Sequence, residues 1–252
     1  MSGHSKWKTI KHQKGAADAK RGQLFTKITR ELMMAARQGG GDPSGNSRLR
    51  LAVDKAREAN MPTENIERAI KRALGTADGQ AQLEEVVYEG YGPSGVAILV
   101  FVVTDNRNRA VSEIRNVMDR NSGKLGQAGS VSRGFEQKGV LTLEVEPKRA
   151  EEVALLAIDL GAEDFSVDGS FVELRCDSAN LEGLRNALEK PGVQLTTAEL
   201  TMVPKALVPL DEHSAEQTLR LLDRLEELDD VQRVATNADF PERVLERYKA
   251  AA

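Results

Sequence analysis

The sequence predicts an α+β fold of several domains, in which a three-helix N-terminal domain precedes two α/β domains, one inserted in the other. Three observations lead to this prediction. Apolar residues recur at helical spacing up to about residue 75, and strand-like runs alternate with helical patterns beyond residue 83. The chain of 252 residues is also longer than a typical domain of roughly 100–200 residues.

Three amphipathic helices are expected in the first 75 residues. The first covers about 18–38, and the glycine- and proline-rich run at 39–43 favours a stop after it. The second and third are expected at 46–60 and 63–75. Short loops join these helices, as in a small helical domain. The polar, aperiodic residues 76–82 are expected to be a linker.

Strand patterns begin after this linker. Residues 96–103 are apolar throughout and mostly β-branched, which is typical of a central strand buried on both faces. A shorter strand is expected at 86–89, a helix at 109–121, and a weak strand at 131–135. This middle block therefore has three strands and one helix.

Residues 140–202 are expected to form strands and helices in the order of a known arrangement. Strand, helix, strand, strand, helix and strand are expected in turn at 140–145, 148–160, 164–167, 171–176, 179–190 and 193–202. This β-α-β-β-α-β order is the ferredoxin-like arrangement.

A helix at 212–228 and a strand at 231–236 would complete the same plan for the middle block. Two ferredoxin-like α/β domains are therefore expected, one interrupting the other. The expected boundaries are 1–75 for a basic helical nucleic-acid-binding domain, 83–136 plus 207–238 for a discontinuous α/β domain, 137–206 for the inserted domain and 239–252 for a C-terminal tail.

Composition excludes several classes of protein. With 40 % hydrophobic and 29 % charged residues, the chain fits a soluble globular protein and not a disordered one. Its longest apolar run, at 96–103, is far short of the roughly 20 residues that span a bilayer, and the N-terminus lacks the apolar core of a secretory signal. The single cysteine, Cys176, excludes an intrachain disulfide framework and a multi-cysteine zinc site. A cytoplasmic protein without a membrane partner is expected.

Neither a catalytic nor a metal-binding motif occurs in the sequence. The three histidines are scattered, so they assemble neither a metal cluster nor a catalytic triad locally. Residues 90–95 match G-x-G-x-x-G, but a strand follows them where dinucleotide binding needs a helix. A non-enzymatic function without a cofactor is therefore expected.

The formal net charge of −4 hides two parts of opposite charge. Residues 1–75 carry 16 basic and 7 acidic side chains, a net of +9, and the rest of the chain carries −13. Such asymmetry suggests that the basic part contacts nucleic acid or another acidic surface. The alternative is a solvated charged face that binds nothing.

The N-terminal segment is the strongest candidate for binding, because its basic residues are interleaved with a tryptophan and two histidines. Lysines neutralise phosphates, and an indole offers a face for base stacking. The alternative is a solvated tail with Trp7 packed on the helical domain. The expected nucleic-acid-binding residues are Lys6, Trp7, Lys8, Lys11, His12, Lys14, Lys20, Arg21, Lys27 and Arg30.

A secondary anion site would lie where a helix follows the buried strand. Backbone amides at a helix start favour anions, and Arg107 and Arg109 would add phosphate donors. The sequence alone favours the alternative, in which Asp105, Asn106 or Asn108 caps the helix and the arginines are solvated.

Several motifs together resemble the YebC/PmpR family of probable transcriptional regulatory proteins, to which a mitochondrial translational activator of cytochrome c oxidase also belongs. The motifs are Gly3-His4-Ser5-Lys6-Trp7, Asp18-Ala19-Lys20-Arg21-Gly22, Gly39-Gly40-Gly41-Asp42-Pro43, Asn65-Ile66-Glu67-Arg68-Ala69-Ile70, Tyr88-Glu89-Gly90-Tyr91-Gly92-Pro93 and Asp105-Asn106-Arg107-Asn108-Arg109. Two departures stand out. Gln13 and Gln23 occupy positions that are often basic in relatives, and Arg133-Gly134 replaces an apolar or aromatic pair.

The resemblance implies a three-domain architecture and non-enzymatic work on nucleic acid. Some members are described as DNA-binding transcription regulators, and others as ribosome-associated factors that assist translation of difficult sequences such as proline runs. We expect a cytoplasmic nucleic-acid-binding regulator, first as a DNA-binding transcriptional regulator and alternatively as a ribosome- or ribosomal-RNA-binding translation factor. A third interpretation, a protein-interaction scaffold, predicts no salt-sensitive binding of nucleic acid.

Overall fold

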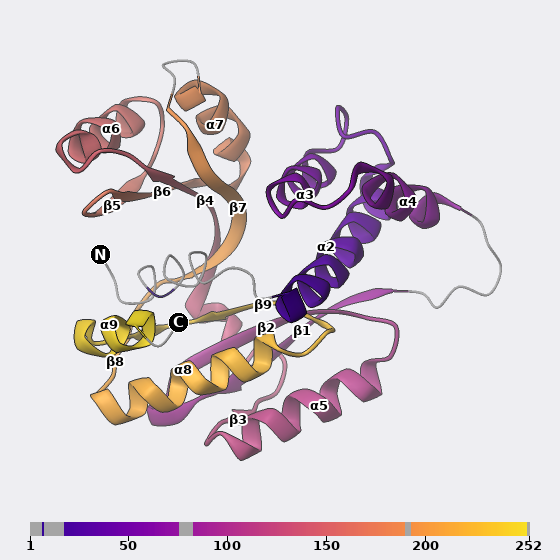
Figure 1. Ribbon diagram of the computed structural model, residues 1–252. Coiled ribbons are helices and arrows are strands. Elements are labelled where there is room, and N and C mark those ends of the chain that lie inside the picture. Colours follow the sequence, from indigo (N-terminus) through magenta and orange to yellow (C-terminus); the bar gives the residue numbers. More distant parts are fainter. Residues whose placement is uncertain (1–6, 8–17, 76–82, 190–192, 251–252) are drawn as a thin grey trace.

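The computed structural model describes residues 7, 18–75, 83–189 and 193–250, with side chains described for Trp7 and from residue 21 onward (Figure 1). Three helices come first and two sheets with helices on one face follow, which confirms the predicted α+β fold class. None of the helices within these ranges is long and apolar enough to cross a membrane.

The helical domain consists of α2 (Asp18–Gly39), α3 (Ser47–Glu58) and α4 (Thr63–Leu74). Their apolar faces, which the three- and four-residue spacing predicted, meet in one buried core. Asn46 fixes the loop between α2 and α3, because its side chain accepts a hydrogen bond from the backbone N–H of Leu49 and donates to the carbonyls of Ala35 and Gly40.

The middle sheet has the strand order β3-β1-β2-β9, with every neighbouring pair antiparallel. Its strands are β1 (Glu84–Tyr91), β2 (Ala97–Thr104), β3 (Lys124–Leu125) and β9 (Val231–Thr236). Helices α5 (Arg107–Arg120) and α8 (Glu212–Glu226) cover one face, as Figure 1 shows. The core between them holds the apolar residues of β2 that face these helices.

The inserted sheet has the order β5-β6-β4-β7 and is also antiparallel throughout. Its elements are β4 (Phe135–Glu144), α6 (Pro147–Asp159), β5 (Asp164–Asp168), β6 (Phe171–Asp177), α7 (Leu181–Glu189) and β7 (Leu195–Pro204). Short 3-10 turns lie at Pro93–Gly95, Ser132–Gly134 and Ser178–Asn180. The predicted β-α-β-β-α-β order is present in full.

The two sheets share one spatial plan with different connections. In each, the strand that precedes the first helix (β2 or β4) lies beside the last strand (β9 or β7), and the strand after that helix lies at the far edge. The remaining central strand differs, since β1 precedes β2 in the chain whereas its counterpart β6 follows β5. Because β9 pairs with β2 across the whole insert, we propose the division into 83–136 plus 207–238 and 137–206.

Two sequence-based expectations are wrong. Residues 132–134 of the strand expected at 131–135 form a 3-10 turn, and the strand expected at 140–145 begins earlier, because β4 pairs with β7 from Phe135 onward. The expected tail at 239–252 contains a helix, α9 (Glu242–Ala250), preceded by β10 (Ala238–Asp239), which pairs in parallel with β8 (Val208–Pro209). Two buried residues of α9, Val244 and Leu245, join the core of the middle sheet.

Candidate nucleic-acid interface

Half of the ten residues expected to bind nucleic acid lie outside the described residues. They are Lys6, Lys8, Lys11, His12 and Lys14. Lys20 lies in the first turn of α2, but its side chain is also outside the described part. Arg21 is exposed on α2, with its guanidinium 5.8 Å from the centre of the Phe25 ring.

Trp7 lies in the core and not at the surface. Its side chain is 1 % exposed and belongs to the core of the middle sheet. The indole meets the ring of Phe240 at a centroid distance of 6.1 Å and an interplanar angle of 44°. The expected stacking of Trp7 on a base is therefore wrong for this conformation, because the protein already covers the face of the indole. The alternative of packing on the helical domain is also wrong, since the partners come from the other end of the chain.

Lys27 and Arg30 turn toward the protein and not toward solvent. The Lys27 ammonium donates a hydrogen bond to the carbonyl of Glu226 at the end of α8, and Arg30 donates to the carbonyl of Asp229. Burial lowers the pKa of Lys27 to about 8, although Asp229 opposes this shift. These two side chains dock α2 on the turn between α8 and β9, so their expected role in binding nucleic acid is corrected.

Asp230 connects three elements at this turn. Its carboxylate is 3 % exposed, lies 2.9 Å from Nη1 of Arg30 and 2.8 Å from Nη2 of Arg109, and accepts a hydrogen bond from Oγ1 of Thr104 at 2.8 Å. Hydrogen bonds to Asp230 and then to Asp105 raise the pKa of Arg109. The carboxylate thus pins α2, the end of β2 and the start of α5 together.

The expected secondary anion site is occupied by the protein's own carboxylates. Arg109 pairs with Asp230 and Asp105, and Arg107 lies 2.8 Å from Glu84. Asn106 caps α5, because its side chain accepts a hydrogen bond from the backbone N–H of Arg109. Arg107 and Arg109 therefore do not form an open phosphate site. The cap expected in the alternative is present, but the arginines are ion-paired and not simply solvated.

Further ion pairs hold α3 against strand β1 and helix α7. Arg48 pairs with Glu85 of β1, and its hydrogen bond lowers the pKa of that carboxyl. On α7, Glu182 lies 3.0 Å from Arg50 and Arg185 lies 2.9 Å from Asp54. These partners are 37 to 132 residues apart in sequence. Sequence reasoning missed them, because nothing local marks which charges will meet.

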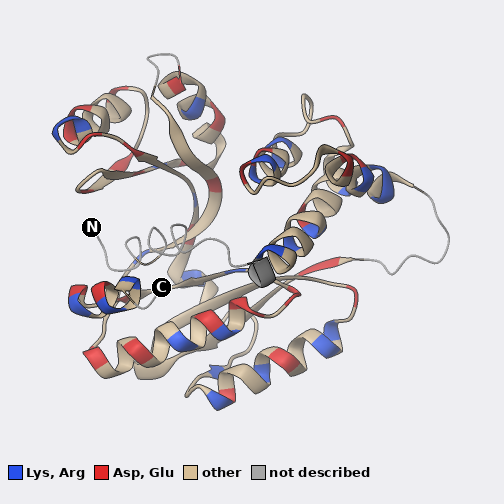
Figure 2. Ribbon diagram, viewed as in Figure 1, with Lys and Arg blue, Asp and Glu red and all other residues tan. Residues whose placement is uncertain are grey.

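The exposed basic side chains of the helical domain lie mainly on α3 and α4. They include Lys55, Arg57, Arg68, Lys71 and Arg72. Figure 2 shows blue segments on these two helices, with red segments among them as on α5, α6 and α8. The pairs within this surface are weak, since Lys71 and Glu67 are 3.6 Å apart and mostly exposed. This surface therefore presents several cationic side chains that are open to a polyanion.

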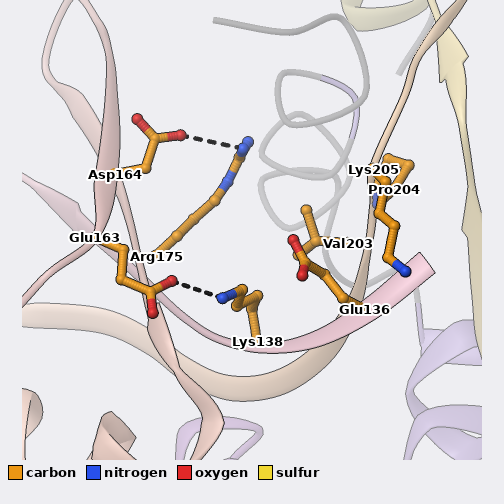
Figure 3. A pocket seen from close by; sticks show the side chains of 8 residues that line it. All are labelled: Glu136, Lys138, Glu163, Asp164, Arg175, Val203, Pro204 and Lys205. Carbon is orange, nitrogen blue, oxygen red and sulfur yellow. Dashed lines mark hydrogen bonds and ion pairs between the residues drawn. The ribbon is translucent and has the colours of Figure 1, made fainter. Parts of the chain in front are cut away.

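A cavity of about 280 Å³ lies on the face of the inserted sheet opposite α6 and α7 (Figure 3). Its cations are held by neighbouring acceptors. Lys138 is 2.7 Å from Glu163, Arg175 is 3.4 Å from Asp164, and Lys205 donates to a backbone carbonyl. The eight lining residues include no serine, cysteine or histidine, and no group of three potential ligands that could hold a metal ion occurs among the residues the structure describes. The cavity therefore does not offer a cluster of open cations.

Comparison with known proteins finds one family along the chain. Residues 5–76 match the TACO1/YebC protein N-terminal domain, and residues 83–238 match the TACO1/YebC second and third domain. A relative from Dehalococcoides mccartyi is 53 % identical over 252 residues, which is all of both chains. One from Dictyoglomus thermophilum is 49 % identical over 247 residues, 98 % of this chain and 99 % of the relative. Both are named probable transcriptional regulatory proteins.

A solved structure has a similar fold. The crystal structure of a conserved hypothetical protein from Aquifex aeolicus superposes with a TM-score of 0.82 at 44 % sequence identity. The match covers 89 % of this chain and 93 % of the Aquifex chain.

Proposed function

The chain belongs to the TACO1/YebC family, and from this premise we propose that it is a non-enzymatic transcriptional regulator that binds DNA through its basic N-terminal region. The observation that carries the proposal is the full-length similarity to relatives named probable transcriptional regulatory proteins. A regulator of transcription acts on DNA, and the charge of +9 on residues 1–75 supplies the attraction to phosphates. The protein acts in the cytoplasm, which its single, buried cysteine fits.

The proposed contacts are the residues that remain from the expected set once the side chains seen to pack within the protein are removed. They are Lys6, Lys8, Lys11, His12, Lys14, Lys20 and Arg21. Lys27, Arg30 and Trp7 are left out, because their side chains pack within the protein. Residues 76–252, which contain the two α/β domains, carry the charge of −13 and would be repelled by the same polyanion. DNA should therefore approach from the N-terminal side.

The test is competition among duplex DNA, ribosomal RNA and an unrelated RNA for the full chain, across a salt series. We expect duplex DNA to compete best. Lys6, Lys8 and Lys11 changed together to alanine should weaken binding and flatten the slope of log K against log salt by about 2–3 units, because each neutralised phosphate contributes about 0.9. The matched control changes Arg68, Lys71 and Arg72 to alanine. It removes the same charge from the surface of α4.

The outcomes separate the interpretations. An equal loss of slope in both triple variants would show that only total charge matters and would refute the N-terminal site. Preferential binding of ribosomal RNA would replace DNA binding with a role in translation. Absence of salt-sensitive binding to any of the three would refute the proposed function.

A further inference from the structure

The helical domain has a core of its own, and its attachment to the α/β part of the chain has a deep side and a shallow side. The deep side, which we call the α2 anchor, is the contact of Lys27 and Arg30 with the turn between α8 and β9. Arg30 lies 2.9 Å from Asp230, whose side chain is only 4 % exposed. Domains joined mainly by polar contacts commonly move relative to each other. The strength of the shallow side therefore decides whether this domain can move.

The shallow side, which we call the α3 latch, consists of ion pairs of α3 with β1 and α7. The pairs are Arg48 with Glu85, Arg50 with Glu182, and Asp54 with Arg185. Their side chains are between 22 % and 38 % exposed, and Figure 1 shows α3 on the side of the helical domain that faces α7. Leu51 adds an apolar contact with the core of the inserted domain. Because solvent weakens ion pairs this exposed, the α3 latch is easier to break than the α2 anchor.

The carboxylate of Glu85 occupies a set of donors that belongs to the helical domain. Arg48 donates from Nη1 and Nη2 to its two oxygens, and Nε2 of Gln38 donates to Oε2 at 3.1 Å. The hydrogen bonds from Arg48 hold the pKa of this carboxyl below its usual range. A guanidinium fork that binds two carboxylate oxygens fits two phosphate oxygens equally well. Glu85 thus covers donors that suit a phosphate, although Arg48 also lies 2.9 Å from Glu31 of its own domain.

Arg50 is paired less completely than Arg48. Its Nη2 lies 3.0 Å from Oε2 of Glu182. Nε of Arg50 and Oε1 of Glu182 are both buried and have no hydrogen-bond partner within the described ranges. A buried donor without an acceptor is unfavourable, whereas a phosphate accepts from Nε and Nη2 of one guanidinium together. The closed latch therefore leaves a hydrogen bond of Arg50 unmade that a phosphate would make.

We propose that Arg48 and Arg50 form a second phosphate-binding site, which Glu85 and Glu182 cover in the closed conformation and which nucleic acid opens by replacing these carboxylates. The α2 anchor stays in place, and the helical domain rotates about it. This inference rests on the proposed function and adds a covered site and its regulation. A closed conformation lowers the apparent affinity according to the fraction of molecules that adopt it. Weakening the latch from its acidic side should therefore strengthen binding.

The first experiment measures opening directly by pulsed electron paramagnetic resonance. Spin labels are attached to the full-length protein at Thr63→Cys on α4 and Leu155→Cys on α6, which are exposed positions without charge. Cys176 is 0 % exposed and stays unlabelled. Saturating duplex DNA should lengthen the distance between the labels. The control pair, Ser112→Cys on α5 with Leu155→Cys, joins the two α/β domains and should keep its distance.

Two results of this experiment would overturn the inference even though DNA is bound. One is an unchanged distance between α4 and α6 at saturating DNA. The other is an equal lengthening in the control pair, which would show a general loosening of the protein and not a rotation of the helical domain.

The second experiment compares affinities for duplex DNA at one salt concentration. Glu85→Gln with Glu182→Gln keeps the shape of both side chains and removes their charge. This variant should bind about threefold more tightly or better than a matched control. The control, Glu64→Gln with Glu67→Gln, removes the same charge from exposed positions of α4. Arg48→Gln with Arg50→Gln also breaks the latch but removes the proposed site, so it should bind no more tightly than the wild-type protein.

These affinities also separate the two proposals. Equal tightening in the latch and control variants would show that only total charge matters, and would overturn the covered site. Tightening in the arginine variant as large as in the carboxylate variant would show that release of the helical domain is enough without phosphate contacts, and would also overturn it. In both cases DNA binding itself stands. Absence of salt-sensitive binding in the wild-type protein and all variants refutes the proposed function, and the covered site with it.

Discussion

Replacing Asp230 with alanine should destabilise the protein by about 2–4 kcal/mol. Removing one partner of a buried ion pair typically costs about 3–5 kcal/mol, because the remaining charge stays buried and unpaired. The structure reduces this figure. Arg109 is 43 % exposed and keeps Asp105, and Arg30 is 18 % exposed and keeps a backbone carbonyl. Thr104 loses one acceptor but still accepts from a backbone N–H.

The assay is urea unfolding followed by Trp7 emission and by circular dichroism, so that separate transitions would be seen. A double-mutant cycle between Asp230→Ala and Arg30→Ala isolates the pair, and we expect a coupling energy of about 1–3 kcal/mol. Glu67 and Lys71 provide the control cycle. They are 3.6 Å apart and 60 % and 79 % exposed, so their coupling should be about 0.3–0.5 kcal/mol.

Two results would refute this reasoning about Asp230. One is a change in unfolding free energy below about 0.5 kcal/mol for Asp230→Ala, which is typical of an ordinary surface position. The other is a coupling energy with Arg30 no larger than that of the exposed control pair. Either result would mean that α2 is not held on the α8–β9 turn by this carboxylate in solution.

Three further predictions follow from buried polar groups. Burial lowers the pKa of Lys27 from 10.5 to about 8 in the folded state. Between pH 8 and 10.5 the unfolded chain therefore binds more protons than the folded protein, so the free energy of unfolding should rise with pH. Lys27→Met should remove that rise, as measured by urea unfolding at several pH values. Burial raises the pKa of Cys176 to about 11, so its thiol should resist a disulfide reagent at pH 8 in the native protein. Gly139→Ala, whose new Cβ would lie 2.7 Å from Sγ, should speed that reaction and cost about 1–3 kcal/mol. Burial alone would raise the pKa of Glu89, but hydrogen bonds from three backbone N–H groups of residues 129–132 lower it overall. Glu89→Gln should therefore lower the free energy of unfolding by about 1–3 kcal/mol at pH 7. The loss should be much smaller in thermal unfolding at a pH below the folded-state pKa of this carboxyl.

The helices and central strands could be predicted because their signals are local. The apolar spacing of α2, α3 and α4 marks the face that each buries, and the continuous apolar run of β2 marks a strand covered on both sides. The alternation of elements in the inserted domain was enough to give its topology. In these parts, periodicity and tertiary burial agree.

The missed features depend on contacts between distant residues. α9 has only two fully buried residues, Val244 and Leu245, which is too weak a pattern to predict a helix. It is stabilised by a core that includes Trp7, more than 200 residues earlier. Lys27 and Arg30 likewise have acceptors 199 residues away in sequence. A basic residue looks the same in the sequence whether it meets phosphate or a helix end, so charge alone overestimated the binding site.

This double use of basic residues determines how a salt titration should be interpreted. Arg30, Arg48 and Arg50 attach the helical domain to carboxylates of the α/β part of the chain, and added salt weakens these pairs as well as contacts with phosphate. The absolute salt slope of the wild-type protein therefore contains a contribution from domain docking. That contribution cancels in the difference between wild type and the Lys6, Lys8 and Lys11 variant, because both retain the same docking pairs. The difference in slope, and not the slope itself, counts the phosphates that these three lysines contact.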